Sequence, residues 1–118
     1  MTNRSGVLRR EPDVGKVFKA LADPTRRAVI ERLGRGSAAT TDLAGDFGMA
    51  LPSFVQHLRV LEDSGLVASR KEGRVRTYWL TPAPLGAAES WLSEQRDLWE
   101  RRLDQLDEHL LEMRKENS

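Results

Sequence analysis

Residues 40–80 hold the pattern that most restricts the fold. Two short helical patterns, 41–47 and 52–63, are joined at Gly48, and two short strand patterns follow within 67–80. Two helices joined by a tight turn and followed by a β-hairpin are typical of a winged helix-turn-helix, whose second helix enters a groove of DNA. We therefore predict a mainly α fold with a small β-hairpin, organised as a winged helix-turn-helix with a long C-terminal helix.

The second helical pattern, extended to 51–63, predicts which side chains face the DNA. Its apolar residues Phe54, Leu58 and Leu61 are spaced four and three apart, so they share the face that packs on the core. Hydroxyl, amide and guanidinium groups on the other face can pair with base edges or phosphates. The residues predicted to face outward are Ser53, Gln56 and Arg59, with Val55 and His57 partly outward.

The predicted hairpin runs from Val67 to Lys71 and from Val75 to Leu80, with Glu72-Gly73 at the turn. Four cations stand within seven residues around its tip. Charged side chains often protect the edges of a surface hairpin, but a basic cluster beside a helix-turn-helix favours contact with phosphates or the minor groove. The predicted wing contacts are Arg70, Lys71, Arg74 and Arg76.

Upstream of this stretch, two helices are expected to complete the core. The first begins after Asp13, and the second begins at Asp23-Pro24, because an Asp N-cap followed by proline is a strong helix start. Arg26 and Arg27 in its first turn are disfavoured by the helix dipole. A charge network with a neighbouring helix is the favoured explanation for them, and contact with DNA phosphate is the alternative.

Thr40 or Thr41 is expected to cap the third helix, and Thr41 is also included among the predicted DNA-binding residues. After the hairpin, 81–84 is rich in proline and should end the sheet. One long helix then runs from Leu85 to about Met113, with an apolar seam in steps of three and four. A symmetric dimer would cover such a stripe, although a ligand groove between helices is the alternative. The predicted dimerisation residues are Leu92, Trp99, Leu103, Leu106 and Leu110.

Length and charge agree with a small DNA-binding protein. The 118 residues predict a single domain with a flexible arm at 1–12, a winged-helix core at 13–82 and a dimerisation helix at 83–118. Residues 1–80 carry 14 Lys/Arg and 9 Asp/Glu, whereas 81–118 carry 5 and 9, so a basic body precedes an acidic remainder. The chain lacks cysteine, a signal-peptide pattern and a membrane-spanning run. We expect a cytoplasmic protein without a cofactor.

Three segments together resemble the ArsR-type winged-helix transcriptional repressors. They are LADPTRRAVIERL at 21–33, LPSFVQHLRVLEDSGLV at 51–67 and the basic hairpin GRVRTYWL at 73–80. WLSEQRDLWERRLDQLDEHL at 91–110 is similar to the last helix of a metal-independent branch of that family. The resemblance implies a homodimer that binds double-stranded DNA at a pseudo-palindromic operator and represses transcription, often of its own operon. It also implies base reading by Ser53, Val55, Gln56 and His57, and backbone contacts by the wing.

Two positions depart from the family pattern. Ala50 stands where the helix start usually carries serine, which removes a cap worth about 1 kcal/mol and one phosphate donor. Val55 replaces a polar reader that is common in the family, and it could contact a thymine methyl group instead.

The metal sites of the family are incomplete in this chain. Residues 39–43 lack the cysteine pair of its metal sensors. Asp107 and His109 resemble half of a second kind of site, but the matching downstream ligands are absent, so we predict no metal. Alternatives to a DNA-binding repressor are a winged-helix module that binds proteins, or a metal-responsive repressor with a cross-dimer site at Asp107 and His109. No residue spacing supports an enzyme.

Overall fold

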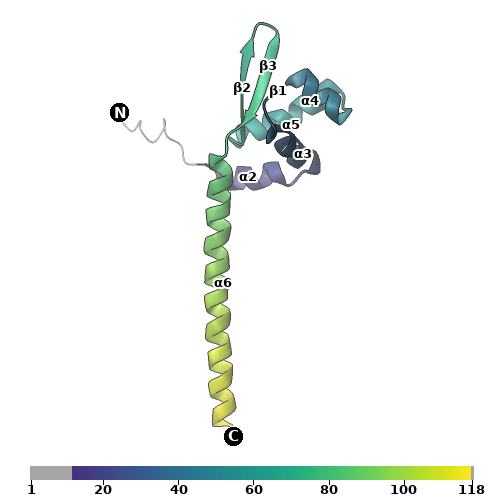
Figure 1. The fold of residues 1–118 in the computed structure, drawn as a ribbon. Helices are drawn as coiled ribbons and strands as arrows, with labels where there is room; N and C mark the ends of the chain where they lie inside the picture. The colour runs from purple at the N-terminus through teal and green to yellow at the C-terminus, as the bar shows by residue number, and fades with distance from the viewer. Residues whose placement is uncertain (1–11, 118) are drawn as a thin grey trace, which may run out of the picture. The chain divides into compact units, whose positions relative to one another are not determined.

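The computed structural model describes residues 12–117. These residues form a mainly helical fold with one small antiparallel sheet (Figure 1). The elements are α2 (Val14–Leu21), α3 (Pro24–Leu33), β1 (Ala38–Ala39), α4 (Thr40–Phe47), α5 (Leu51–Asp63), β2 (Val67–Glu72), β3 (Val75–Leu80) and α6 (Ala83–Glu116). The predicted fold class is therefore confirmed. The arm predicted at 1–12 lies outside the described residues except for Pro12.

The described residues divide after Ala88 into two units. The first contains α2 to β3 and the beginning of α6, because Pro84 and Ala88 of that helix are buried. The second begins at Glu89 and contains the rest of α6. The boundary predicted from the sequence, between a winged-helix core at 13–82 and a dimerisation helix at 83–118, lies earlier and remains a prediction.

The core of the first unit is built by one apolar face from each element. Val17, Val29 and Leu43 are fully buried, and they come from α2, α3 and α4 in turn. Phe54, Leu58 and Leu61 of α5 are fully buried as predicted, which explains how a short helix is held in one orientation. Phe47 at the end of α4 packs on Phe54, with 5.5 Å between the ring centroids.

The helix starts differ in whether a side chain caps them. Asp13 and Asp23 accept hydrogen bonds from the backbone N–H groups of Lys16 and Arg26, at 3.2 and 3.0 Å. The expected threonine cap of α4 is wrong, because Ala39 is its N-cap and makes no side-chain bond. The Thr40 hydroxyl donates instead to the Arg76 carbonyl of β3, at 3.2 Å.

The sheet has three strands in the order β1-β3-β2, one more than the hairpin expected from the sequence. Ala38 and Ala39 pair with Tyr78 and Thr77, and a segment of two alanines gives no alternating pattern from which a strand could be predicted. The turn of the hairpin lies at Gly73-Arg74, one residue later than predicted, because β2 extends to Glu72. Gly73 takes the left-handed φ of 63° that this tight turn requires.

Candidate nucleic-acid interface

A left-handed glycine joins α4 to α5. Gly48 has φ 60° and ψ 29°, and its N–H and that of Met49 donate to the carbonyls of Gly45 and Ala44. This arrangement ends α4 and turns the chain into α5 within a few residues. The predicted helix-turn-helix is therefore present, and the hydrophobic face of α5 fixes which of its residues are exposed.

The outward face of α5 carries the predicted polar side chains. Ser53, Gln56 and Arg59 are exposed, whereas Val55 is half-buried. Pro52 lies in the first turn of the helix, where its missing N–H costs no intrahelical bond, and Ala50 provides no side-chain cap. In the first turn of α4, Thr41 is also exposed. These side chains offer hydrogen-bond donors and acceptors to a neighbouring molecule.

His57 lies differently from its neighbours on α5. Its imidazole Nδ1 lies 3.3 Å from the guanidinium Nη1 of Arg26 and 3.8 Å from Asp23 Oδ2. The helical spacing predicted that His57 faces partly outward. In the structure, one edge of its ring faces α3, and its side chain is 21% exposed. Periodicity could not reveal this contact, because the two residues are 31 positions apart in the chain.

Arg26 and Arg27 form hydrogen bonds with the C-terminal end of α2. Arg26 donates from Nε to the Ala20 carbonyl at 2.8 Å and from Nη2 to the Lys19 carbonyl at 3.0 Å, while Arg27 donates to the Leu21 carbonyl at 2.7 Å. These bonds are made to carbonyl groups in the last turn of α2, and they place cations at the negative end of its dipole. The favoured explanation expected a charge network with a neighbouring helix. The neighbouring helix is present, but the contacts to it are hydrogen bonds to backbone carbonyls and not ion pairs.

Asp23 links the same residues. The N–H of Arg26 holds the pKa of the Asp23 carboxyl below its ordinary value. Desolvation opposes this effect, and the nearby His57 and the Arg26 charge lower the pKa further by smaller amounts. The carboxylate is therefore ionised at neutral pH and serves as cap and as neighbour of the imidazole.

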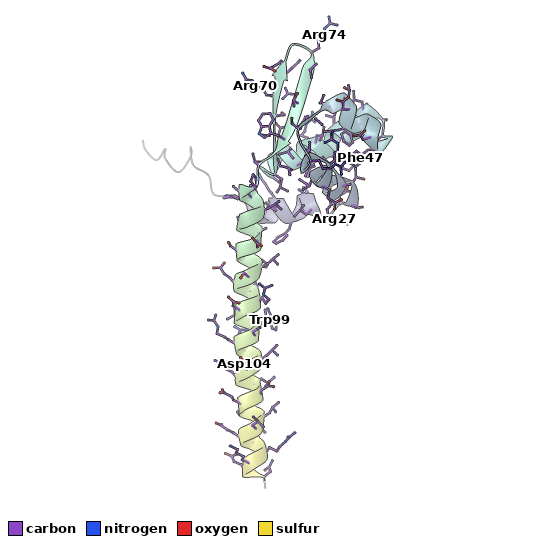
Figure 2. The ribbon with its side chains drawn as sticks, viewed as in Figure 1. Arg27, Phe47, Arg70, Arg74, Trp99 and Asp104 are labelled. Carbon is purple, nitrogen blue, oxygen red and sulfur yellow. The ribbon has the colours of Figure 1, made fainter. Side chains whose placement is uncertain are left out.

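The four wing cations are exposed but lie on different faces of the hairpin. Lys71 pairs with Arg76 and Ser69 with Tyr78, so these four share one face, while Arg70 lies on the other. Arg74 is in the turn, and Figure 2 shows its side chain pointing away from the helices at the tip of the wing. The sequence predicted one basic cluster at the hairpin tip and did not show that its cations lie on different faces.

Arg76 is held by a hydrogen-bond chain that joins the wing to α5. Its Nη1 donates to the Ser69 hydroxyl at 2.8 Å, and that hydroxyl donates to Glu62 Oε2 at 2.8 Å. Sequence reasoning missed Ser69 and Glu62. An acid near the end of a recognition helix and a hydroxyl in the next strand are too common to signal this pairing.

A hollow of about 500 Å³ lies between α5, the beginning of α4 and one face of the wing. Three cations and one carboxylate line it, which makes the surface suitable for a polyanion. Tyr78 forms part of its wall, and burial raises the pKa of this phenol, with a further contribution from the charge of Glu62. The lining residues are Thr40, Val55, Arg59, Glu62, Lys71, Arg76 and Tyr78.

The described part of the chain contains no cluster of three or more His, Cys, Asp or Glu side chains that could hold a metal ion. Asp107 and His109 are both exposed on α6. Between residues 12 and 117, no helix is long and apolar enough to cross a membrane.

Comparison with known proteins agrees with this geometry. A helix-turn-helix domain family matches residues 21–70. The HTH-type transcriptional regulator Rv2034 of Mycobacterium tuberculosis is 45% identical over 78 residues, which cover 66% of this chain and 71% of the relative. The arsenical resistance operon repressor of Escherichia coli K12 is 36% identical over 86 residues, covering 68% and 74% of the two chains.

Solved structures give the same result over a larger part of the chain. The crystal structure of the ArsR family transcriptional regulator RHA00566 is similar with a TM-score of 0.71 and 54% identity, covering 74% of this chain and 90% of that one. An ArsR-like transcriptional regulator from Rhodococcus sp. RHA1 has the same TM-score at 32% identity, with 79% and 88% covered. The winged helix-turn-helix, its exposed donors and these relatives together show that the chain belongs to the ArsR family of DNA-binding transcriptional regulators, which are not enzymes.

Proposed function

We propose that the protein is a homodimeric repressor that binds a pseudo-palindromic operator, including one in the promoter of its own operon. The observation that carries this proposal is the shared hollow between α5 and the wing, because Arg59 of the helix and the hairpin cations Lys71 and Arg76 border the same space. A DNA strand along this hollow would meet both elements. The repressor role rests on the family and on relatives that are named as repressors.

The two elements are proposed to have different tasks. Ser53 and Gln56 on α5 read base edges, with Val55 available for a thymine methyl group. Arg59, Lys71 and Arg76 face the hollow and bind phosphate oxygens, while Arg70 and Arg74 contact the backbone or minor groove farther along the duplex. Thr41, exposed in the first turn of α4, contacts a phosphate.

Fluorescence anisotropy with a duplex from the promoter of its own operon tests this proposal. The full chain should bind that duplex more tightly than a random duplex of equal length, and both affinities should fall as salt rises, because phosphate binding releases counterions. Equal affinity for the two duplexes, or affinity that is independent of salt, would contradict the proposed function.

A pair of substitutions tests the division of tasks. Gln56→Ala should lower affinity for the operator about five- to hundredfold and hardly change binding to random DNA, because a base contact is lost. Arg74→Ala should weaken both duplexes alike and reduce the salt slope by about 1. The same titrations measure both variants, and identical behaviour of the two would refute this division.

The second unit supplies the proposed dimer contact. Leu92, Trp99, Leu103, Leu106 and Leu110 are between 50% and 61% exposed, and helical periodicity places them along one stripe of α6. Soluble monomers rarely expose so long an apolar stripe, and a second copy covers it by a symmetric contact. A two-fold dimer also explains why a pseudo-palindromic operator is expected.

A further inference from the structure

The contact between Arg26 and His57 links the helix before the helix-turn-helix to the recognition helix α5. Arg26 lies in the first turn of α3, and all three guanidinium nitrogens make contacts: Nε and Nη2 donate to carbonyls of α2, and Nη1 lies 3.3 Å from His57 Nδ1. The guanidinium is therefore held from two elements, and its direction toward the imidazole is fixed.

The chemistry of this contact determines the protonation of the ring. A guanidinium has only donors and stays charged at any ordinary pH, so Nδ1 must accept the hydrogen bond with its lone pair. A neutral imidazole carries one proton, which must then be on Nε2. Asp23 would favour a proton on Nδ1, but its Oδ2 is farther from that atom, at 3.8 Å, and accepts the Arg26 N–H at 3.0 Å.

We propose that Arg26 is a positioning residue that holds His57 as the Nε2–H tautomer, so that α5 presents this N–H to a phosphate oxygen of the bound DNA. The DNA contact rests on the proposed function, whereas the tautomer does not. Between residues 12 and 117, the polar contacts of the ring all involve Nδ1, and 21% of the side chain is exposed. In this proposal, His57 is a hydrogen-bond donor to phosphate whose tautomer Arg26 fixes, and it does not read a base.

Nitrogen NMR of the full chain tests the tautomer without DNA. The chain has only two histidines, and the exposed His109 provides an internal reference for an unconstrained ring. In mildly alkaline buffer, Nδ1 of His57 should show the shift of an unprotonated nitrogen and Nε2 that of a protonated one. A proton found on Nδ1 would overturn the proposal.

A matched pair of arginine variants tests the positioning role. Arg26→Met removes the donor, so His57 should become a mixture of tautomers like His109, and affinity should fall about three- to tenfold for operator and random duplexes alike, as for one lost hydrogen bond. Arg27→Met removes a neighbouring charge and carbonyl bond but no contact to His57. It should leave the tautomer and the affinity unchanged. An unchanged tautomer in Arg26→Met, or equal loss of affinity in both variants, would refute the role.

Substitutions of His57 keep the test decisive if Arg26→Met does not fold. Asn at position 57 places an acceptor near the position of Nδ1 but no donor near Nε2, whereas Gln places an amide donor near Nε2. His57→Gln should therefore bind both duplexes more tightly than His57→Asn. Equal affinities would contradict the phosphate contact, and a difference confined to the operator would assign the contact to a base.

The outcomes separate this inference from the proposed function. In the wild-type complex, the Nε2 proton should exchange more slowly with solvent than in the free protein. If the protein binds no duplex, the proposed function and the phosphate contact both fail, and the NMR assignment alone decides whether Arg26 fixes the ring. If DNA binds and the exchange of this proton is unchanged, the phosphate contact alone is refuted.

Discussion

Tyr78 is the residue at which the sheet meets both helices of the helix-turn-helix. It pairs with Ala38 of β1 and Ser69 of β2, is 5% exposed, and borders the hollow near Glu62 of α5. Its phenol must lose a proton to become charged, and a buried site opposes that charge. Deprotonation of Tyr78 is therefore coupled to unfolding of the structure around it.

The chain has a single tyrosine, so its titration can be followed by ultraviolet absorbance. We expect the folded protein to titrate above the ordinary pKa of 10.0, because burial and the charge of Glu62 disfavour the phenolate. A raised pKa means that the folded state retains its proton longer than the unfolded state. Stability from this residue is then complete below the unfolded pKa and is lost as pH rises through the folded pKa.

Glu62→Gln should lower the tyrosine pKa part of the way toward 10.0, because it removes the second of the two effects that raise this pKa. The unfolded chain in denaturant provides the control titration. A midpoint that is the same in native and denaturing buffer would contradict the assigned burial effect.

At the residue scale, the sequence predicted which side chains face outward but not the contacts between distant segments. The outward positions of Ser53, Gln56 and Arg59 followed from the spacing of three apolar residues. The contacts of Arg26 with His57, and of Ser69 with Glu62 and Arg76, join segments whose mutual approach no local pattern encodes. Whether the predicted DNA-binding residues touch DNA remains a prediction.

At the scale of elements, the helices were predictable where a cap or a period was strong. Asp23-Pro24 starts α3, Gly48 ends α4, and the spacing of Phe54, Leu58 and Leu61 defines α5. The long helix was predicted over 85–113 and extends over Ala83–Glu116. By contrast, β1 consists of two alanines whose strand conformation depends on pairing with β3, a partner that a local pattern does not identify.

The turn between α4 and α5 gives a prediction for stability. Gly48→Ala should lower the free energy of unfolding by about 1 to 2 kcal/mol, because a side chain disfavours the left-handed conformation. The space around a Cβ at this position is open, so the cost is conformational and not steric. Gly48→Asn should cost less, because asparagine tolerates this region better. Urea unfolding measures all three proteins.

Gly45, three residues earlier, is the matched control for this experiment. A Cβ at this position would also meet open space, but Gly45 lies within α4 and has no positive φ. Gly45→Ala should therefore stabilise the protein by about 0.5 to 1 kcal/mol. A loss of stability in both alanine variants would contradict the conformational explanation.

At the scale of the whole molecule, the chain combines a basic winged-helix unit with a second unit formed by α6 from Glu89. In the proposed function, the first unit binds DNA and the second unit self-associates. The stripe along α6 was predictable, because large apolar residues recur in steps of three and four. The partner that covers it cannot be identified from one chain, because a homodimer and another apolar surface satisfy the same pattern.

Leu103→Glu should convert the proposed dimer to a monomer, because two carboxylates would be forced into its apolar contact. Sedimentation velocity measures the mass, and the anisotropy titration should show weaker operator binding. Asp104→Lys is the control, since this neighbouring exposed residue is rotated by about 100° around the helix. Figure 2 labels Asp104 together with Trp99 of the stripe. A monomeric wild type, or equal dissociation of both variants, would refute the α6 dimer.

The Arg76–Ser69–Glu62 chain, together with the Thr40 bond to the Arg76 carbonyl, has a consequence for the kind of DNA that is selected. These bonds connect the wing to both α4 and α5, so the spacing between the helix and the hairpin is fixed before DNA arrives. A duplex whose groove width does not match this spacing must bend or change its width, at a cost that depends on its sequence. We therefore expect operator preference to include base steps that no side chain touches, through the flexibility of the duplex itself.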